Sequence, residues 1–298
     1  MPPWWTAARR VVKWGSRRVD NATVTSPPSD APAKPRIDLE GDPVLEFQPA
    51  VDLCTGRLLG FEALLRWVHP TLGLIAPGVL IPWAEANGTI FELNAWVLSE
   101  ACRQATTWPW GLQIAVNCSL VQLRGLGASA AAAEALARSG LDPDRLTVEV
   151  TESAVADDEA NKDLCHLVAL GVHLAVDDVG TSWDTLENLR RRSIEIAKID
   201  RSFIAGLDLD EGMNRAIVEA IVHVTHALAM STVAEGVETV VQVTMLQDLG
   251  ADVAQGFYFA PALPADDARA LAQADPPTVF TLTPEQDVQH RRLAARGA

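Results

Sequence analysis

Several features that mark other protein classes are missing from this chain of 298 residues. No apolar run approaches the roughly 18 residues that a membrane-spanning helix requires. The net charge of −15 at pH 7 argues against general binding to nucleic-acid phosphates, so we expect no DNA or RNA partner. No G-x-G-x-x-G or G-x-x-x-x-G-K-[ST] motif follows any apolar run, which removes the usual sign of a phosphate-binding loop in an open α/β sheet.

Cysteine is also scarce, and no two cysteines form a C-x-x-C pair. The four are Cys54, Cys102, Cys118 and Cys165. Each lies in an apolar segment, so we expect small buried thiols in a reducing, cytoplasmic environment, not disulfides or a zinc site. The histidines show no H-E-x-x-H spacing, which removes a second common zinc motif.

The ends of the chain differ in composition from its centre. Residues 1–18 carry five basic residues and no acid, and residues 21–40 are rich in Pro, Ser and Ala. We therefore expect a basic arm and linker over 1–40, a folded domain over 41–275 and a polar tail over 276–298. Two alternatives stay open for the first 18 residues. They are a disordered cationic tail, or a contact with an anionic membrane at its inner face through tryptophan and basic side chains.

Short β-rich runs alternate with helical patterns from residue 43 onward. The expected strands are 44–53, 57–67, 112–119, 145–153, 174–176, 195–203, 231–237 and 252–259. The expected helices are 77–88, 94–108, 128–140, 158–171, 185–192, a long helix with Ile217, Ile221, Val224 and Leu228 as its apolar stripe, 238–250 and 264–274. Such alternation gives parallel strands joined by crossover helices. About eight strands over roughly 230 residues fit an α/β fold of the TIM-like (β/α)8 barrel type, with an open doubly wound sheet as the alternative.

An unusual polar residue stands at or near the carboxyl end of almost every expected strand. These residues are Glu62, Asn117, Glu149, Glu152, Asp177, Asp178, Lys198, Asp200, Glu235 and Gln255. In a β/α barrel the carboxyl ends of the strands converge on one face, where active sites lie. The pattern therefore predicts one shared site at that face.

The types of residue in this set indicate its chemistry. Carboxylates and an amide are oxygen ligands, which suit Mg²⁺ or Mn²⁺, and no His or Cys joins them. Several ionised carboxylates need compensation when they crowd together, and two metal ions would supply it and serve in-line displacement at phosphorus. Adjacent strand residues point to opposite faces, so Asp178 must leave strand geometry if both it and Asp177 are to reach metal. Lys198 either acts on a metal-bound water or forms a structural pair with a carboxylate.

The chain resembles the EAL-domain phosphodiesterases, which hydrolyse cyclic di-GMP to linear pGpG. The resemblance covers about residues 43–272. Its motifs are FQP at 47–49, FEALLRW at 61–67, VNCS at 116–119, EVTES at 149–153, DD-x-G at 177–180, KIDRSF at 198–203, VAEGVET at 233–239 and AQGFYF at 254–259. It implies a TIM barrel whose first strand runs antiparallel, binding of cyclic di-GMP and a homodimer.

The resemblance also implies roles for single residues. Two ions of Mg²⁺ or Mn²⁺ are implied, and their implied ligands are Glu62, Asn117, Glu149, Asp177, Asp178 and Glu235. The implied catalytic residues are Glu62, Lys198, Glu235, Gln255 and Glu152, with Lys198 acting on the water, Gln255 supporting it and Glu152 steadying the loop after Asp178. The implied substrate contacts are Gln48, Leu65, Arg66 and Asp200.

One loop departs from the family pattern, which reads Phe-Gly-Thr-Gly-Tyr-Ser-Ser-Leu after the paired aspartates. Residues 179–186 read VGTSWDTL here, and Ser182 stands where a glycine is usual. A glycine there supplies positive φ values that serine adopts only at a cost. In the family this loop couples the metal site to the dimer. The alternative to an active enzyme is therefore a weakly active or inactive domain that acts as a cyclic di-GMP receptor or protein-interaction module. An unrelated Mg²⁺-dependent TIM-barrel lyase is a third reading.

Overall fold

The computed structural model describes residues 40–109, 111–180, 193–208, 212–275 and 277–282. Its strands are β1 (Asp42–Asp52), β2 (Leu58–His69), β3 (Gly73–Ile75), β4 (Gln113–Asn117), β5 (Leu146–Thr151), β6 (His173–Val179), β7 (Ile196–Ile199), β8 (Ser231–Ala234), β9 (Val253–Ala254) and β10 (Leu263–Pro264). They follow the order β10-β1-β9-β8-β7-β6-β5-β4-β2-β3, and β1 also pairs with β2. That last pairing closes the sheet into a barrel.

The first barrel strand runs against the others. Strand β1 pairs antiparallel with both β2 and β9. The remaining neighbours around the barrel are parallel, from β2–β4 through β8–β9. The expected (β/α)8 barrel with an antiparallel first strand is confirmed, and the carboxyl ends of the parallel strands form one face.

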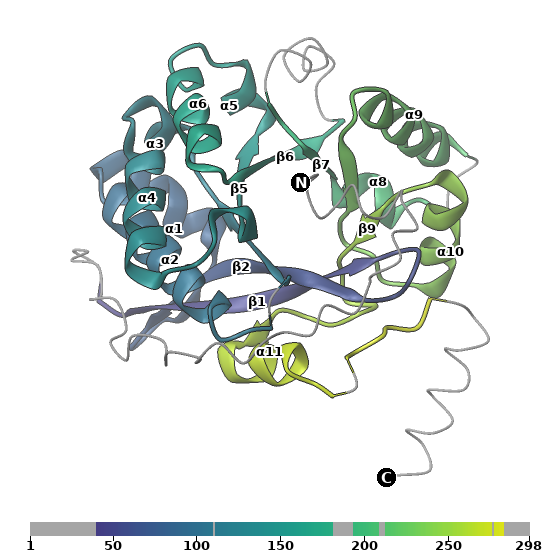
Figure 1. The fold of residues 1–298 in the computed structure, drawn as a ribbon, viewed down its shortest axis with the longest axis horizontal. Helices are drawn as coiled ribbons and strands as arrows, with labels where there is room; N and C mark the ends of the chain where they lie inside the picture. Colours follow the sequence, from purple (N-terminus) through teal and green to yellow (C-terminus); the bar gives the residue numbers. More distant parts are fainter. Residues whose placement is uncertain (1–39, 110, 181–192, 209–211, 276, 283–298) are drawn as a thin grey trace, which may run out of the picture.

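Helices surround the barrel (Figure 1). They are α1 (Pro77–Asn87), α2 (Ile90–Ala105), α3 (Leu120–Arg124), α4 (Gly127–Ser139), α5 (Glu152–Ala156), α6 (Asn161–Leu170), α8 (Arg201–Ala205), α9 (Met213–Ala227), α10 (Val240–Leu249) and α11 (Ala265–Ala272). Helix α11 packs against β1. None of the helices in these described ranges is long and apolar enough to cross a membrane.

Local signals in the sequence explain where single helices begin and end. Thr239 precedes α10 and accepts from Gln242 N, while the Gln242 side chain accepts from Thr239 N, so two end groups of the helix backbone are satisfied reciprocally. Gly250 ends α10 at φ +80°, a value that glycine adopts without strain.

The long helix expected after residue 203 is α9, but its apolar stripe was placed one residue early. The fully buried face comprises Val218, Val222 and Thr225, while Ile217 and Ile221 are only half-buried. The stripe was misplaced because Thr225 is polar by type. Its hydroxyl donates to Ile221 O at 2.8 Å, so the group is satisfied within the helix and can be buried.

Several expected strands end earlier than their sequences indicate, among them 195–203, which ends at Ile199, and 231–237, which ends at Ala234. The run 145–153 leaves strand geometry at Thr151, and Glu152 begins α5. The run 252–259 pairs only at Val253–Ala254, and Phe257 is exposed because the chain turns away. The expected helix 185–192 lies outside the described residues, and the proposed domain boundaries stay predictions.

The expectation of four buried cysteines was wrong for two of them. Cys102 and Cys118 are buried, whereas Cys54 and Cys165 are exposed. Burial raises the pKa of the Cys102 thiol to about 12 despite the nearby Arg145, so that thiol stays protonated. Cys54 follows β1 in a tight turn and Cys165 lies on the outer face of α6, and neither position could be read from the apolar segments around them.

One buried carboxylate joins α4 to α6. Asp163 is fully buried and accepts hydrogen bonds from Ala128 N at 3.0 Å, Ser129 N at 3.3 Å and the Ser129 hydroxyl. The two backbone N–H groups belong to the first turn of α4 and have no partner within that helix. A carboxylate at a helix N-terminus is also favoured by the helix dipole.

We predict that Asp163→Ala lowers the free energy of unfolding by about 3 kcal/mol, because it leaves buried donors without acceptors. Urea denaturation followed by circular dichroism measures the change. Lys162→Ala, at the exposed neighbouring position, is the control and should stay within about 0.5 kcal/mol of the wild type. An Asp163→Ala protein as stable as this control contradicts the assigned role.

Candidate functional site

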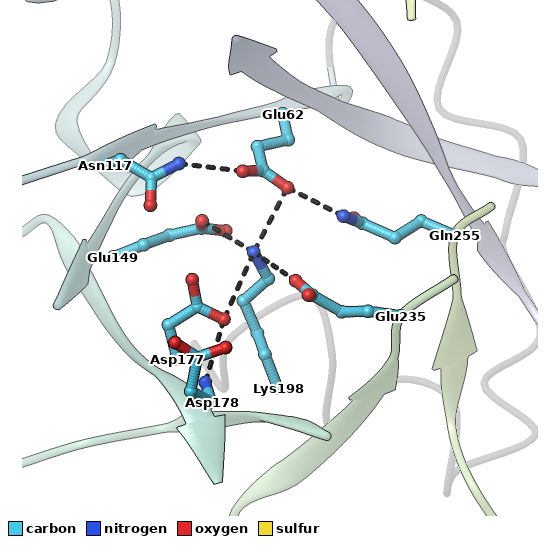
Figure 2. A network of polar contacts seen from close by, with 8 residues as sticks. All are labelled: Glu62, Asn117, Glu149, Asp177, Asp178, Lys198, Glu235 and Gln255. Carbon is cyan, nitrogen blue, oxygen red and sulfur yellow. Dashed lines mark hydrogen bonds and ion pairs between the residues drawn. The ribbon is translucent and has the colours of Figure 1, made fainter. Parts of the chain in front are cut away.

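A single ammonium group lies at the centre of a carboxylate cluster at the carboxyl ends of the strands (Figure 2). Lys198, on β7, places its Nζ 2.7 Å from Glu149 Oε2 and 3.1 Å from Glu62 Oε2. The same Nζ lies 2.6 Å from Glu235 Oε1 and 3.7 Å from Asp177 Oδ1. The lysine side chain is only 2% exposed, so these contacts replace nearly all of its hydration.

Two amide side chains complete the contacts of Glu62. Asn117 donates from Nδ2 to Glu62 Oε1 at 2.7 Å, and Gln255 donates from Nε2 to Glu62 Oε2 at 2.6 Å. Asn117 ends β4, and Gln255 follows β9 directly. The structure therefore brings together residues from β2, β4, β5, β6, β7 and the segments after β8 and β9, as the sequence pattern predicts.

Two opposing effects determine the pKa values of the clustered glutamates: burial raises them, and the positive charge of Lys198 lowers them. Burial would raise the pKa of Glu62, but Lys198 and the hydrogen bonds from Gln255 and Asn117 bring it below its usual value. For Glu149, burial and the negative charge of Glu62 raise the pKa well above the usual value in spite of Lys198. Burial also raises the pKa of Glu235 to about 7, again against the effect of Lys198.

The same two kinds of effect, burial and neighbouring charge, act on the pKa of Lys198 in the opposite directions. Burial alone would lower its pKa, because an ammonium loses hydration. The charges of Glu149, Glu235 and Glu62 outweigh that effect and raise the pKa well above its usual value. Lys198 is therefore a cation in this arrangement.

The paired aspartates lie at a break in the pairing of β6 with β7. The register shifts between Val176 and Val179, and Asp178 has φ +59°. An irregularity of this kind re-aims side chains, and Asp is among the few residues that tolerate the left-handed region. As the sequence argument required, the backbone leaves strand geometry at Asp178, so both carboxylates stand at the rim of the cluster (Figure 2).

Asp178 has a second carboxylate beside it. Burial, the charge of Asp177 and a hydrogen bond with Asp200 raise the pKa of Asp178 to about 6. Asp200 follows β7 and accepts from Ser202 N at 2.9 Å, which caps α8. The structure therefore places Asp200 beside the paired aspartates, at the edge of the cluster.

Glu152 lies where it can hold the chain after the aspartates. Its Oε1 accepts from Gly180 N at 3.2 Å, and Glu152 is the first residue of α5. Gly180 has φ +104°, and a Cβ there would lie 2.8 Å from Ile221 Cδ1 and 2.9 Å from Phe203 Cε2. Glycine is therefore required both by backbone and by packing at this exit. The following residues, including Ser182, lie outside the described chain.

Three of the four expected substrate contacts lie on the long β1–β2 hairpin, and they divide between its two faces. Gln48 lies opposite Glu62 across the pair, on the barrel side. Arg66 is on the same face as Glu62, and its Nε lies 2.8 Å from Glu46 Oε2. Leu65 instead packs against the buried core, because alternate strand residues point to opposite faces. The structure does not bring Leu65 to the cluster.

The sequence analysis missed two supporting residues. Asn94 on α2 is buried and donates from Nδ2 to Asn117 O at 3.1 Å, which holds the end of β4. Asn94 could have been found from the sequence, because it is a polar residue within the apolar face of a helix. Glu46 was missed because nothing in its sequence context indicates that it pairs with Arg66.

The donor chemistry of the cluster fits a hard divalent cation. Four carboxylates face one ammonium group, which leaves formal negative charge without a partner cation. Carboxylate and amide oxygens are the ligands that Mg²⁺ and Mn²⁺ prefer. Within the described ranges, no three His, Cys, Asp or Glu side chains are already arranged as a metal site, since the carboxylates turn to Lys198.

Comparison with curated proteins gives relatives for most of this chain. The bifunctional diguanylate cyclase/cyclic di-GMP phosphodiesterase MucR of Pseudomonas aeruginosa is 42% identical over 233 residues, which cover 76% of this chain and 34% of MucR. The cyclic di-GMP phosphodiesterase NbdA of the same organism is 38% identical over 226 residues, 74% of this chain and 29% of NbdA. The chain thus spans about a third of the length of the curated relatives it matches.

Comparison with solved structures gives relatives of the same kind. The structure described as the PaMucR phosphodiesterase in complex with c-di-GMP superposes with a TM-score of 0.71 at 42% identity, covering 76% of this chain and 93% of that one. Klebsiella pneumoniae BlrP1, in a calcium and cy-diGMP complex, gives a TM-score of 0.65 at 30% identity, with 75% of this chain and 56% of that one covered. The family model of the EAL domain matches residues 38–262. This chain belongs to the EAL domain family.

Proposed function

We propose that this protein is a phosphodiesterase that hydrolyses cyclic di-GMP to linear pGpG. The observation that carries the proposal is the cluster in which Glu62, Glu149, Glu235 and Asp177 surround Lys198 at the carboxyl ends of the barrel strands. A relative with the same fold and 42% identity is described as a c-di-GMP complex. In the proposed reaction a water oxygen bonds to phosphorus in line while the bond to the ribose 3′ oxygen breaks, and that oxygen takes up a proton.

Two ions of Mg²⁺ or Mn²⁺ are the proposed cofactors. The residues that would hold them are Glu62, Asn117, Glu149, Asp177, Asp178 and Glu235. When bound, such ions neutralise the phosphoryl charge and lower the pKa of water to give a nucleophile. The calcium complex of BlrP1 shows that a relative accommodates a divalent cation with its ligand.

The chain's own side chains orient the reactants. Lys198 presents N–H donors from a buried position, so it is suited to orient the attacking water and to offset negative charge on the phosphoryl oxygens. Gln255 fixes Glu62 by a hydrogen bond of 2.6 Å. Glu152 holds Gly180 N and thereby the chain exit after Asp178. Prepositioned groups of this kind cost no reorganisation during the reaction.

Substrate recognition falls to side chains around the cluster. Gln48 is proposed to contact a guanine edge, and Arg66 a phosphate, since a guanidinium matches phosphate geometry. Asp200 is proposed as a further contact. Leu65 packs against the core, so it would support β2 without touching the ligand.

A cyclic di-GMP receptor or protein-interaction module with little turnover is the second candidate. The observation in its favour is the departure of residues 179–186 from the family pattern. The appearance of pGpG from purified protein separates the two candidates.

We propose three further properties. They are a homodimer, a cytoplasmic location, and contact of residues 1–18 with an anionic membrane. The first rests on the family resemblance, and the last on the basic and tryptophan residues of the arm. Sedimentation velocity tests the dimer, and loss of co-sedimentation with anionic vesicles on removal of residues 1–18 tests the membrane contact.

Activity should depend on a divalent metal ion. We expect purified protein with Mn²⁺ or Mg²⁺ to convert cyclic di-GMP to pGpG, measured by liquid chromatography, and to lose this activity after exhaustive chelation. Ca²⁺ should bind and support little turnover, since it is larger and holds looser geometry. Undiminished activity after chelation contradicts the metal proposal.

Glu62→Ala should reduce kcat by more than about 100-fold, the low end for losing a preorganised electrostatic group at a reacting centre. Steady-state kinetics measure this effect, and a melting curve checks that the variant is folded. Glu92→Ala on the exposed side of α2 is the matched control and should keep wild-type kcat. Near-native turnover in Glu62→Ala would remove this residue from the site.

Lys198→Met should lower the free energy of unfolding of the metal-free protein by about 3–5 kcal/mol, because buried carboxylates lose their partner cation. Mn²⁺ should then raise the melting temperature more in this variant than in the wild type, since metal compensates the same charges. Lys162→Met is the control with an exposed lysine. If Mn²⁺ raises the melting temperatures of Lys198→Met and the wild type equally, the metal and the Lys198 ammonium do not share these carboxylates.

A further inference from the structure

A pocket lies inside the barrel beneath the charged cluster. Its lining includes the cluster residues Glu62, Glu149, Lys198 and Gln255, together with side chains from the interior layers of the barrel. The volume open to the centre of a water-sized sphere is about 40 Å³. One ordered water needs roughly 10–15 Å³ on that measure, so the space is sufficient for water.

Small residues leave this space unfilled. Interiors of such barrels are ordinarily packed with bulky branched side chains. Here the lining includes Ala50, Gly60, Ala115 and Ala175 beside larger apolar residues. Gly60 has no alternative, because a Cβ there would lie 2.4 Å from the backbone oxygen of Gln113.

Two residues of the pocket lining each carry a buried polar atom that has no partner among the described residues. Gln113 Oε1 and Thr147 Oγ1 have no hydrogen-bond partner among the described residues, and their residues are 5% and 2% exposed. Both residues line the pocket. They lie on neighbouring strands, where Ala115 pairs with Thr147 in the parallel register of β4 and β5. A buried polar atom without a partner costs about 1–3 kcal/mol.

We propose that this pocket is a binding site for ordered water, held by Thr147 Oγ1 and Gln113 Oε1. Water is favoured over a metal ion because the two unpartnered groups are neutral and belong to an amide and a hydroxyl. It is favoured over an apolar occupant because apolar cavities that stay dry lack such polar atoms.

The proposed water has a consequence for the charged cluster above it. Lys198 and Glu149 belong to the pocket lining, so the water hydrates the cluster from inside the barrel. Burial of charges costs less where water or other dipoles remain close. This role does not depend on whether the protein hydrolyses cyclic di-GMP, so the water site is tested separately from the proposed function.

The direction in which Thr147→Val changes the unfolding equilibrium constant distinguishes a pocket that holds water from a dry one. Valine has nearly the shape of threonine and replaces the hydroxyl with a methyl group, so the polar group is lost with little change in volume. If the hydroxyl binds water, its loss should raise the unfolding equilibrium constant about fivefold to tenfold, as expected for one net hydrogen bond. If the pocket is dry, the substitution removes an unsatisfied buried group, and the constant should fall or stay unchanged, which overturns the proposal.

Thr232→Val is the matched control for the denaturation experiment. Thr232 is fully buried, and its hydroxyl already donates to Asp252 Oδ2 at 3.1 Å. Its loss should destabilise the protein whether or not the pocket holds water, and it calibrates the cost of removing a satisfied hydroxyl. Thr147→Ser, which keeps the hydroxyl, should retain the water.

A high-resolution crystal structure of the full chain provides a second, direct measurement. We expect electron density for water within hydrogen-bond distance of Thr147 Oγ1 and Gln113 Oε1. Crystals pressurised with xenon supply the opposite outcome, since xenon enters dry apolar cavities. Xenon in the pocket of the wild-type protein, with no water density there, would refute the assignment.

Discussion

The buried ammonium group of Lys198 is the interaction on which the rest of the structure depends. Its carboxylate partners lie far away in the sequence, and Glu62 is 136 residues from it. No helix or hairpin brings such distant residues together, whereas a closed barrel brings the carboxyl ends of all its strands to one face. A buried ion pair is maintained only when its geometry and hydrogen bonding are good, because desolvation is costly. The amides of Asn117 and Gln255 meet that condition at Glu62.

Several local features of the barrel follow from the need to build this cluster. The break in strand pairing at Asp177 and Asp178 places adjacent residues at one rim, at the cost of a left-handed backbone conformation. The bond from Gly180 N to Glu152 holds the chain as it leaves that break. Small residues such as Ala115 and Ala175 stand among the bulkier residues that line the pocket next to the cluster. Stability is recovered elsewhere, as in the buried contacts of Asp163.

The sequence was informative where one residue type has one physical meaning. Alternating apolar runs predicted parallel strands with crossover helices and left a barrel and an open sheet as alternatives, and the resemblance to the EAL-domain phosphodiesterases implied the barrel. Polar residues at the strand ends predicted the cluster. Periodicity failed where tertiary contacts decide. Thr225 is buried because its hydroxyl bonds within α9, and Leu65 packs on the core side of β2 while its neighbour Arg66 does not. The sequence placed Lys198 in the shared site, either acting on a water or paired with a carboxylate. Its simultaneous contact with four carboxylates could not be predicted, since it depends on the three-dimensional closure of the sheet.

The charge of the cluster constrains what the site can bind. Four carboxylates around one ammonium leave an excess of negative charge even though burial raises the pKa values of Glu149 and Glu235. The phosphodiester groups of the proposed substrate are also negative, so without further compensation they would be repelled at close range, where screening by salt is weak. Additional cations must therefore be in place for a phosphodiester to reach this face. The carboxylate oxygens that contact Lys198 belong to the residues that would hold those cations. The same charge excess thus explains both the contacts that the carboxylates make with Lys198 and the site's suitability for an anionic substrate once cations are bound.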